Sequence, residues 1–476
     1  MPTSVAMEDS RPTRRDVVKG TAAAGAAGLA GLAGCTQGGN NDGGGNGDGG
    51  NDDGGGGGGG DDNGGGGEET EYPALGNFPV EGDTVTFGFN VPQSGSYSQE
   101  GADELRGYNL AKKHLNNGGG WVDQWEDLSG DGVLGKTVES VEGDTATDPD
   151  AARQSASRMI SRDDAIMVTG GSSSSVAIAV QELCQSEKVL FMACLTHSND
   201  TTGKACVRYS FRELFNAFHT GAALAPVLTE EYGDDLNFYI LYADYTWGQT
   251  VQSSMTQFLE EAGHNLVDSV PTPLGTSDYS SFLSDVPQDE VDMLILTHYG
   301  LDAANSLPQA REAGLDESME LVVPLYNRLM AEAASDSIQG VFGTADWNWQ
   351  LEDDVSQTFT DAFTEEYDKV PSYAARLAYL QTLQYAAAVE RAETFYPPEV
   401  IRELEDYEYD NAGLGAETMR ACDHQAQRPV LVMQGAEEQT EDRLLQISAT
   451  TPTEEVAYGC DEGPAAECEL GEYGDE

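Results

Sequence analysis

From residue 80 onwards, short apolar stretches alternate with longer segments of helical character. TVTFGFNV (84–91), AIMVTGG (165–171) and VLFMACL (189–195) have the β-branched composition of buried strands. The segments between them include 98–117, 148–163 and 175–188, which have helical patterns. Such alternation predicts a parallel sheet with helices on both faces.

The alternation restarts near residue 206, which predicts a second α/β half. Its strands are expected at 237–244, 291–300 and 319–327, with helices at 213–232, 246–263 and 302–315. GVFGTADWNW (340–349) leads into two helices separated by Pro371, and PVLVMQG (429–435) is predicted as a last strand. Ligands of such sheets gather at the loops after the strand carboxyl ends, beside helix N-termini.

The stretch GDGVLGKT, Gly130 to Thr137, matches the phosphate-loop pattern of nucleotide-binding proteins. That pattern requires a strand before it and a helix after it, but here polar WVDQWEDLS precedes and period-two KTVESVE follows. A calcium loop would need a glutamate at its twelfth position, where this chain has Val138. We therefore predict a turn before an edge strand, with no nucleotide, metal or other cofactor.

The chain is strongly acidic, with 83 acidic and 24 basic residues among 476 and a net charge of −59. This charge repels nucleic acid and anionic lipid headgroups and excludes both as partners. It is typical of a surface adapted to molar salt, where the Debye length is about 3 Å, and this interpretation is favoured over calcium storage or a cationic partner.

The N-terminus predicts export and anchoring. TRRDVVK (13–19) has the twin-arginine pattern, and a short Gly/Ala-rich run leads to LAGC, which ends at Cys35. We predict a signal peptide at 1–34 and a lipid on Cys35, although an ordinary cleavage site with an incidental cysteine would look similar. Residues 38–67 contain only Gly, Asn and Asp, which predicts a disordered tether over 35–77. The expected location is the outer face of the cell membrane.

Six short motifs in order point to one family. They are FGxxxPxSGxY from Phe87, DPDxA from Asp148, GGSSSS from Gly170, YxFR from Tyr209, DYxWG from Asp244 and DHQ from Asp423. Together, behind this leader, the chain resembles the branched-chain amino acid, amide and urea receptors of ABC importers, which have the type I periplasmic-binding-protein fold. The resemblance covers roughly residues 78–448.

This resemblance implies an α/β fold of two Rossmann-like lobes joined by a hinge of three chain crossings, near 208–212, 341–346 and 428–432. Lobe 1 is expected at 78–209 and 344–428, lobe 2 at 210–343 and 429–452, and a loose acidic tail at 453–476. It also implies that a small ligand closes the lobes and that an ABC permease, with its ATPase, reads the closed form.

Candidate ligand contacts lie in the loops after the predicted strands. Ser172, Ser173 and Ser174 can satisfy a carboxylate at a helix N-terminus, although a helix cap needs only one serine. The family places ligand contacts where this chain has Thr196 and His197, and an ordinary loop would look similar. Ser94 and Tyr97 follow the first strand, where Tyr97 is expected to wall the pocket.

The second half supplies aromatic and acidic candidates. Tyr245 and Trp247 suit a ligand side chain or a cation, unless they pack into the core. Tyr299 and Asp302 follow another strand; the family often binds an ammonium group with an acidic residue in this region, but Asp302 can equally cap a helix. Tyr326 and Trp347 are further candidates.

Seven cysteines minus the lipidated Cys35 leave six, an even number that is typical of disulfides in an exported chain. Fifteen pairings are open. Cys460–Cys468 is plausible as a local clasp, and Cys206–Cys422 as a tie between two segments of lobe 1, while Cys194 can simply belong to the core.

The sequence favours a binding protein over an enzyme. GxSxG and HExxH motifs are lacking, and the six scattered histidines form no nucleophile–base pair or metal cluster. An amino acid is the favoured ligand, with an amide or urea as the alternative. A ligand-sensing ectodomain with a separate transducer also stays open.

Overall fold

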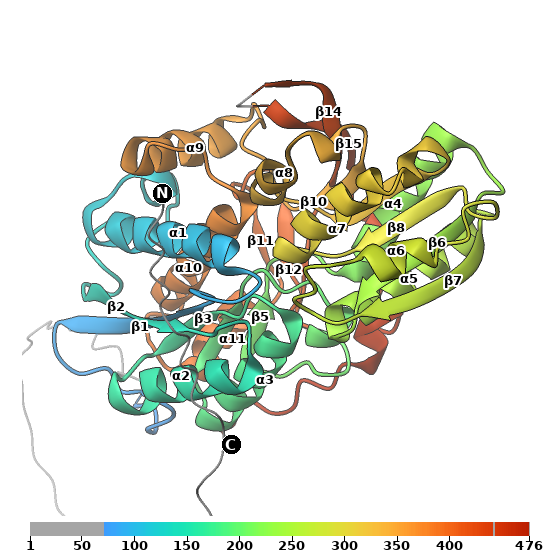
Figure 1. Cartoon of the computed structure of the whole chain (residues 1–476). Helices are drawn as coiled ribbons and strands as arrows, with labels where there is room; N and C mark the ends of the chain where they lie inside the picture. The colour runs from blue at the N-terminus through green and yellow to red at the C-terminus, as the bar shows by residue number, and fades with distance from the viewer. Residues whose placement is uncertain (1–70, 441–442, 476) are drawn as a thin grey trace, which may run out of the picture. The chain divides into compact units, whose positions relative to one another are not determined.

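The computed structural model describes residues 71–440 and 443–475. The predicted signal peptide, Cys35 and most of the predicted tether lie outside the described residues. The described strands form a five-stranded, a seven-stranded and a small three-stranded sheet. Each of the two larger sheets is the centre of one lobe (Figure 1).

The first lobe is built on a wholly parallel sheet. Its strands, in spatial order, are β2 (Thr137–Asp144), β1 (Thr84–Val91), β3 (Met167–Gly170), β4 (Leu190–Ala193) and β5 (Ser210–Arg212). Helices α1 (Ser98–Asn117) and α10 (Tyr373–Ala392) pack on one face and α2 (Pro149–Arg162) and α3 (Ser174–Glu187) on the other. The sequence-based expectation of helices on both faces is confirmed here.

The second lobe has a mixed sheet. Its order is β15 (Arg443–Thr451), β14 (Val430–Thr440), β10 (Phe342–Ala345), β9 (Glu320–Leu325), β8 (Met293–Thr297), β6 (Asn237–Ala243) and β7 (Asn265–Thr272). Strand β14 pairs antiparallel with β10 and with β15, which the sequence reading had not predicted. The helices of this lobe are α4 (Ala217–Tyr232), α5 (Thr246–Glu261), α6 (Ser280–Ser284), α7 (Leu301–Glu312) and α8 (Arg328–Ala334). The predicted helix at 213–232 begins only at Ala217, because Asn216 and His219 form a capping box there.

Three chain crossings join the lobes, as the fold class predicted. The chain passes from β5 into α4, from β10 into α9 (Asp354–Tyr367), and from the small sheet into β14. The small sheet consists of β11 (Tyr407–Tyr409), β12 (Glu417–Met419) and β13 (Ala426–Gln427), and α11 (Pro397–Leu404) precedes it. Strand β5 continues to Arg212, three residues past the predicted lobe boundary at 209.

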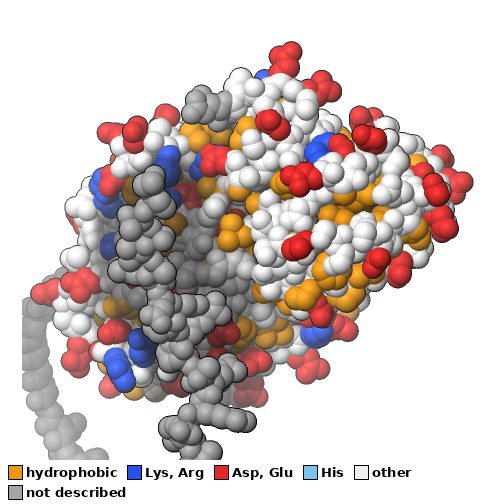
Figure 2. Space-filling view, in the orientation of Figure 1, with side chains coloured by type: hydrophobic (Ala, Val, Ile, Leu, Met, Phe, Trp, Pro, Cys, Tyr) orange, Lys and Arg blue, Asp and Glu red, His pale blue; other side chains and the backbone are white. Residues whose placement is uncertain are grey.

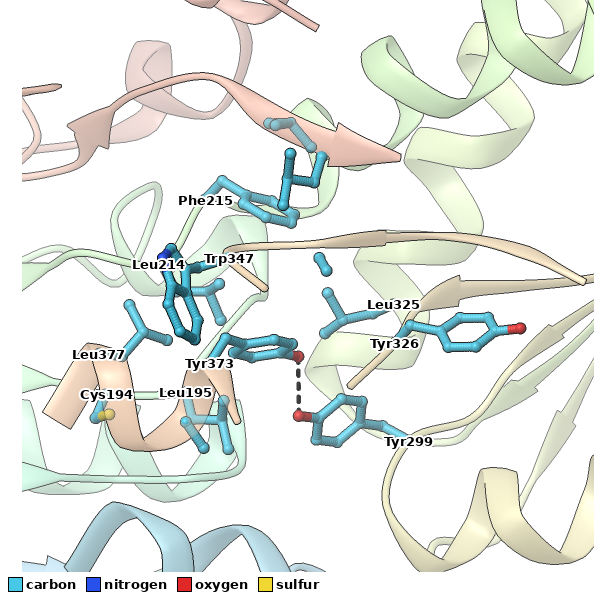
Figure 3. Close-up of a cluster of buried hydrophobic side chains, with 14 of the residues drawn as sticks. Cys194, Leu195, Leu214, Phe215, Tyr299, Leu325, Tyr326, Trp347, Tyr373 and Leu377 are labelled. Atoms are coloured by element: carbon cyan, nitrogen blue, oxygen red, sulfur yellow. Dashed lines mark hydrogen bonds between the residues drawn. The ribbon is translucent and has the colours of Figure 1, made fainter. Parts of the chain in front are cut away.

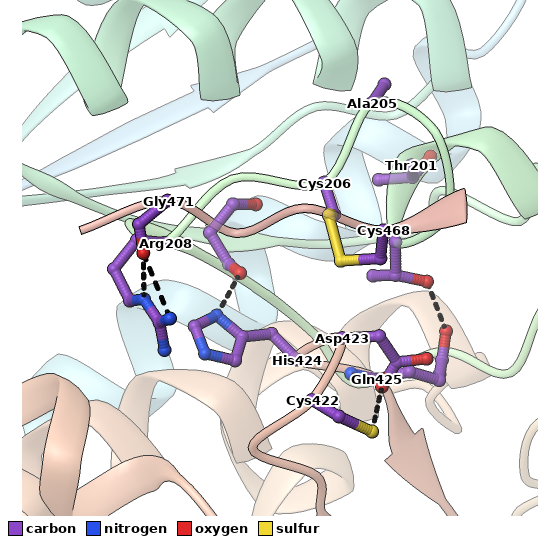
Figure 4. Close-up of a disulfide and its surroundings, with 12 residues drawn as sticks. Thr201, Ala205, Cys206, Arg208, Cys422, Asp423, His424, Gln425, Cys468 and Gly471 are labelled. Atoms are coloured by element: carbon purple, nitrogen blue, oxygen red, sulfur yellow. Dashed lines mark hydrogen bonds between the residues drawn. A yellow bond between two sulfur atoms is a disulfide. The ribbon is translucent and has the colours of Figure 1, made fainter. Parts of the chain in front are cut away.

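The C-terminal segment is ordered, so the expectation of a loose acidic tail is wrong. It contains α12 (Thr453–Val456) and a short 3-10 helix, Gly463–Glu467, and the carbonyl of Gly471 accepts hydrogen bonds from Arg208 (Figure 4). Further 3-10 turns lie at Gly120–Asp123, Asn199–Thr201, Leu315–Glu317 and Ser335–Ile338. The acidic composition did not indicate this order, because covalent bonds and aromatic contacts hold the segment in place.

The disulfides join the predicted four cysteines in a different pairing. Cys206 bonds to Cys468 and Cys422 bonds to Cys460, so both suggested pairs are wrong. Each observed bond ties the C-terminal segment to the first lobe or its neighbouring small sheet, which no spacing rule could reveal. Cys194 and Cys184 are free and buried.

The phosphate-loop match lies in a turn before an edge strand, as predicted. The ammonium group of Lys136 donates a hydrogen bond to the carbonyl of Gly82, and Thr137 begins β2 at the sheet edge. Over the described ranges, no helix is both long and apolar enough to cross a membrane, and no three His, Cys, Asp or Glu side chains are grouped to hold a metal ion. Carboxylates are spread over the face that Figure 2 shows, consistent with the acidic composition.

Candidate functional site

A small cavity of about 10 Å³ lies between the lobes, where the strands of both sheets end. It is lined by three serines, a histidine, two leucines and four aromatic residues: Tyr97, Ser172, Ser173, Ser174, Leu195, His197, Tyr245, Trp247, Tyr299 and Leu325. These residues follow β1, β3, β4, β6 and β8 or end β9, as the parallel-sheet rule requires. A space of this size holds about one water molecule.

Four aromatic rings form a cycle around this cavity, which we call the aromatic box. Tyr97 comes from the first lobe, and Tyr245, Trp247 and Tyr299 come from the second. Ring centroids are 5.6 Å apart for Tyr97–Tyr299, 6.1 Å for Trp247–Tyr299 and 5.9 Å for Tyr245–Trp247. The hydroxyl oxygens of Tyr97 and Tyr245, 2.6 Å apart, close the cycle.

Hydrogen bonds fix the orientation of Trp247. Its indole nitrogen donates to Nδ1 of His197 at 2.8 Å, so the proton of that imidazole is on Nε2, which lies 2.8 Å from the hydroxyl of Thr220. Burial, with the charges of Arg212 and His219, lowers the pKa of His197 well below its usual value. His197 is therefore neutral and links the first lobe to the second.

The serine hydroxyls are already engaged. Ser172 donates to a carboxylate oxygen of Glu104, and Ser174 accepts the backbone N–H groups of His197 and Ser198. Ser173 has φ +92° and makes no capping hydrogen bond; its hydroxyl pairs with Ser175 instead. The simple helix-cap alternative thus does not describe Ser173, and the serines brace two strand-end loops.

Buried carboxyl groups surround the aromatic box. Burial raises the pKa of Glu100 to about 7, that of Glu104 to about 8 and that of Asp302 to about 6. Asn327 donates to both Glu100 (3.1 Å) and the Tyr299 hydroxyl (2.6 Å), which places Glu100 one side chain away from the rings. The surroundings are therefore acidic, while none of the lining residues is a lysine or arginine.

Eight of the thirteen predicted contacts line the cavity, and five do not. Ser94 donates to Asp144, and the Thr196 hydroxyl pairs with Thr201. Asp302 lies in the first turn of α7 and accepts the backbone N–H of Gly275 rather than capping that helix. The other two are Tyr326 and Trp347, whose polar atoms donate to the Val341 carbonyl and the Ser356 hydroxyl. Figure 3 shows Tyr326 pointing away from Tyr299.

The sequence reading missed five residues at the site. Leu195 and Leu325 line it, Glu100 and Asn327 support it, and the hydroxyl of Tyr373 is 2.9 Å from that of Tyr299 (Figure 3). Asn327 and Leu325 stand at a strand end, the signal that identified the other residues. Glu100 gave no such signal, because acidic residues on a helix of an acidic protein are expected to face solvent.

A wider groove of about 340 Å³ lies elsewhere, at Arg328, Trp349 and Lys369. It contains none of the predicted contacts and shares no residue with the lining of the smaller cavity. We therefore place the candidate site at the aromatic box.

The fold and the interlobe site define a two-lobed solute-binding protein, and comparisons with known proteins agree. The chain belongs to the periplasmic binding protein family, whose model matches residues 84–440. The type I periplasmic-binding-protein fold is confirmed, and the family is one of solute-binding proteins rather than enzymes.

Three similar proteins are informative. "Leu/Ile/Val-binding protein homolog 7" of Brucella abortus is 27% identical over 250 residues, which cover 51% of this chain and 59% of that protein. A periplasmic binding protein from Burkholderia mallei has a TM-score of 0.73 at 21% identity, covering 81% of this chain and all of that one. A branched-chain amino acid ABC transporter periplasmic ligand-binding protein from Burkholderia xenovorans has a TM-score of 0.66 at 21% identity, covering 78% and 96%.

Proposed function

We propose that this protein is the extracytoplasmic substrate-binding component of an ABC importer. It captures a small polar solute, with an amino acid favoured over an amide or urea, by closing its two lobes, and it delivers the solute to a permease driven by an ATPase. The lipid on Cys35 and the tether hold it at the outer face of the membrane. The single observation that carries the proposal is the convergence of strand-end side chains from both lobes on one cavity.

Closure follows from the contacts between the lobes. The Tyr97–Tyr245, Glu100–Asn327 and His197–Trp247 hydrogen bonds each have one partner in either lobe. They form only when the lobes meet, so a solute that bridges the same residues shifts the population toward this form. A permease can then distinguish the closed form from the open one.

The first test is a thermal-shift screen in molar potassium chloride against amino acids, amides and urea. We expect at least one solute to raise the melting temperature in a saturable manner, since a ligand that binds the native state stabilises it. A chain that responds to none of these solutes, nor to the methylated compounds named below, would contradict the proposal.

The second test asks whether closure contributes to affinity. Tyr97→Phe and Tyr245→Phe each remove one hydroxyl of the interlobe pair, worth about 0.5–1.5 kcal/mol, so each should weaken binding about 2- to 10-fold. The double variant should be no weaker than either single one. Tyr367→Phe is the matched control, because its hydroxyl donates to the Arg106 carbonyl within the first lobe. Additive losses would show that the two hydroxyls do not act as a pair.

A further inference from the structure

The aromatic box places four rings around the cavity. Three of the neighbouring ring pairs are in edge-to-face or tilted contact, with centroids 5.6–6.1 Å apart. Aromatic faces attract a cation within about 6 Å of the ring centroid. Tyr97 is the one ring contributed by the first lobe, so the degree of closure sets the width of the box.

Buried acidic side chains provide negative charge near the cavity without lining it. Glu100 and Asp302 are buried, and neither carboxylate lines the cavity. Their charges nevertheless act at the cavity. The pKa of Tyr97 is raised most by burial, next by Tyr245, and then by the charges of Asp302 and Glu100. A cation in the box is thus favoured by two nearby acids at a distance beyond hydrogen bonding.

Two of the hydrogen-bond acceptors that line the cavity are already occupied. The Ser174 oxygen accepts two backbone N–H groups. Nδ1 of His197 accepts the indole N–H of Trp247. A primary ammonium carries three N–H donors, and leaving them unpaired in a buried site costs free energy. A fully methylated ammonium has none to satisfy.

We infer that the cleft prefers a ligand whose cationic nitrogen is methylated, seated in the box of Tyr97, Tyr245, Trp247 and Tyr299. This inference rests on the proposed function and names its ligand class as N-methylated amino acids or related quaternary ammonium compounds. The remainder of the ligand then lies toward the serine loops and the N-terminus of α3, where partial positive charge favours a carboxylate.

The decisive measurement compares matched ligands on the unaltered protein. Calorimetric titration in molar potassium chloride would use glycine, proline and leucine, each beside its fully N-methylated counterpart. The shape control is 3,3-dimethylbutanoate, which keeps the carboxylate but has a neutral carbon in place of the cationic nitrogen of trimethylglycine. We expect at least one methylated compound to bind about 30-fold more tightly than its parent, and trimethylglycine to exceed the shape control.

Variants locate the effect. Trp247→Leu and Tyr245→Leu should weaken binding of the best methylated compound about 10- to 30-fold, whereas Trp247→Phe, which keeps an aromatic face, should lose less. Tyr242→Leu is the control, because this partly buried ring is on β6, which leads into the loop of Tyr245, but is outside the lining. The ligand-induced change in tryptophan fluorescence that is lost in Trp247→Phe gives an independent readout of occupancy.

Each result decides between the two proposals. Tighter binding of a parent amino acid than of its methylated form would overturn the inference and leave the proposed function standing. Equal binding of trimethylglycine and 3,3-dimethylbutanoate would also overturn it, because shape alone would then suffice. Failure of every solute in both panels would overturn the proposed function itself.

Discussion

At the residue scale, the buried carboxyl group of Glu104 in the first lobe should make the free energy of unfolding depend on pH. Its side chain is fully buried, Ser172 donates to one carboxylate oxygen, and the other has no hydrogen-bond partner among the residues that the structure describes. Burial raises its pKa from 4.5 to about 8. Between these two values the native state holds a proton that the unfolded state has lost, so the free energy of unfolding falls as pH rises.

Glu104→Gln should remove this dependence. The contribution of one such group is up to about 1.4 kcal/mol per pH unit, so the variant should gain stability relative to the parent protein between pH 5 and pH 8. Denaturant unfolding at both pH values measures the difference. Glu139→Gln, on the exposed side of β2, is the control and should leave the difference unchanged. An unaltered pH slope in Glu104→Gln would show that Glu104 is ionised in the folded protein.

The same residue shows why the site could be predicted only in part. Strand-end position identifies Tyr97, Trp247 and the serines, because topology alone brings strand ends together. Glu104 and Glu100 are turned inward by the packing of α1 against its neighbours. The acidic composition of the chain would instead predict that they face solvent. Which tyrosine lines the cavity, as Tyr299 does and Tyr326 does not, depends on side-chain packing that no local pattern encodes.

At the scale of elements, periodicity predicted most helices to within a few residues, and long-range links escaped it. Helix α1 begins and ends where its pattern predicted, at Ser98 and Asn117. Strand β15 was not predicted, because it is largely exposed and its pairing with a partner strand, rather than a pattern in its own sequence, makes it a strand. The C-terminal segment was misjudged for the same reason: its contacts are 262 and 38 residues away along the chain.

Removing the two disulfides should have unequal effects. In the chain-entropy account a disulfide that closes a longer loop stabilises the protein more, by about 5.5 kcal/mol for Cys206–Cys468 and about 4 kcal/mol for Cys422–Cys460. We expect Cys206→Ser with Cys468→Ser to lower the free energy of unfolding by about 1–2 kcal/mol more than Cys422→Ser with Cys460→Ser. Denaturant unfolding under oxidising conditions measures both. A larger loss from the shorter loop would indicate that local packing, rather than loop entropy, dominates.

At the scale of the whole molecule, a buried charge cluster joins the three crossings between the lobes. Glu213 follows β5, Asp346 follows β10, and Arg428 precedes β14. Arg428 Nη1 is 3.0 Å from a carboxylate oxygen of each acid. Arg376 of α10 lies 3.1 Å from Asp346, and Glu417 of β12 lies within 3.7 Å of both arginines. All five side chains are buried, so the loss of one of these charges would leave its partners unpaired inside the hinge.

The cluster has three acids for two arginines, and Glu417 resolves the imbalance. Burial, together with the Glu213 carboxylate, raises the pKa of Glu417 well above its usual value, which favours its protonated form. Glu417→Gln mimics that neutral form and should change the free energy of unfolding by less than about 1 kcal/mol. Arg428→Gln leaves buried carboxylates without their partner and should cost about 3–5 kcal/mol. Denaturant unfolding at pH 7 in molar salt compares the two, and because buried pairs are poorly screened the contrast should persist there. Equal losses from both variants would mean that Glu417 is ionised and that the hinge depends on all three acids.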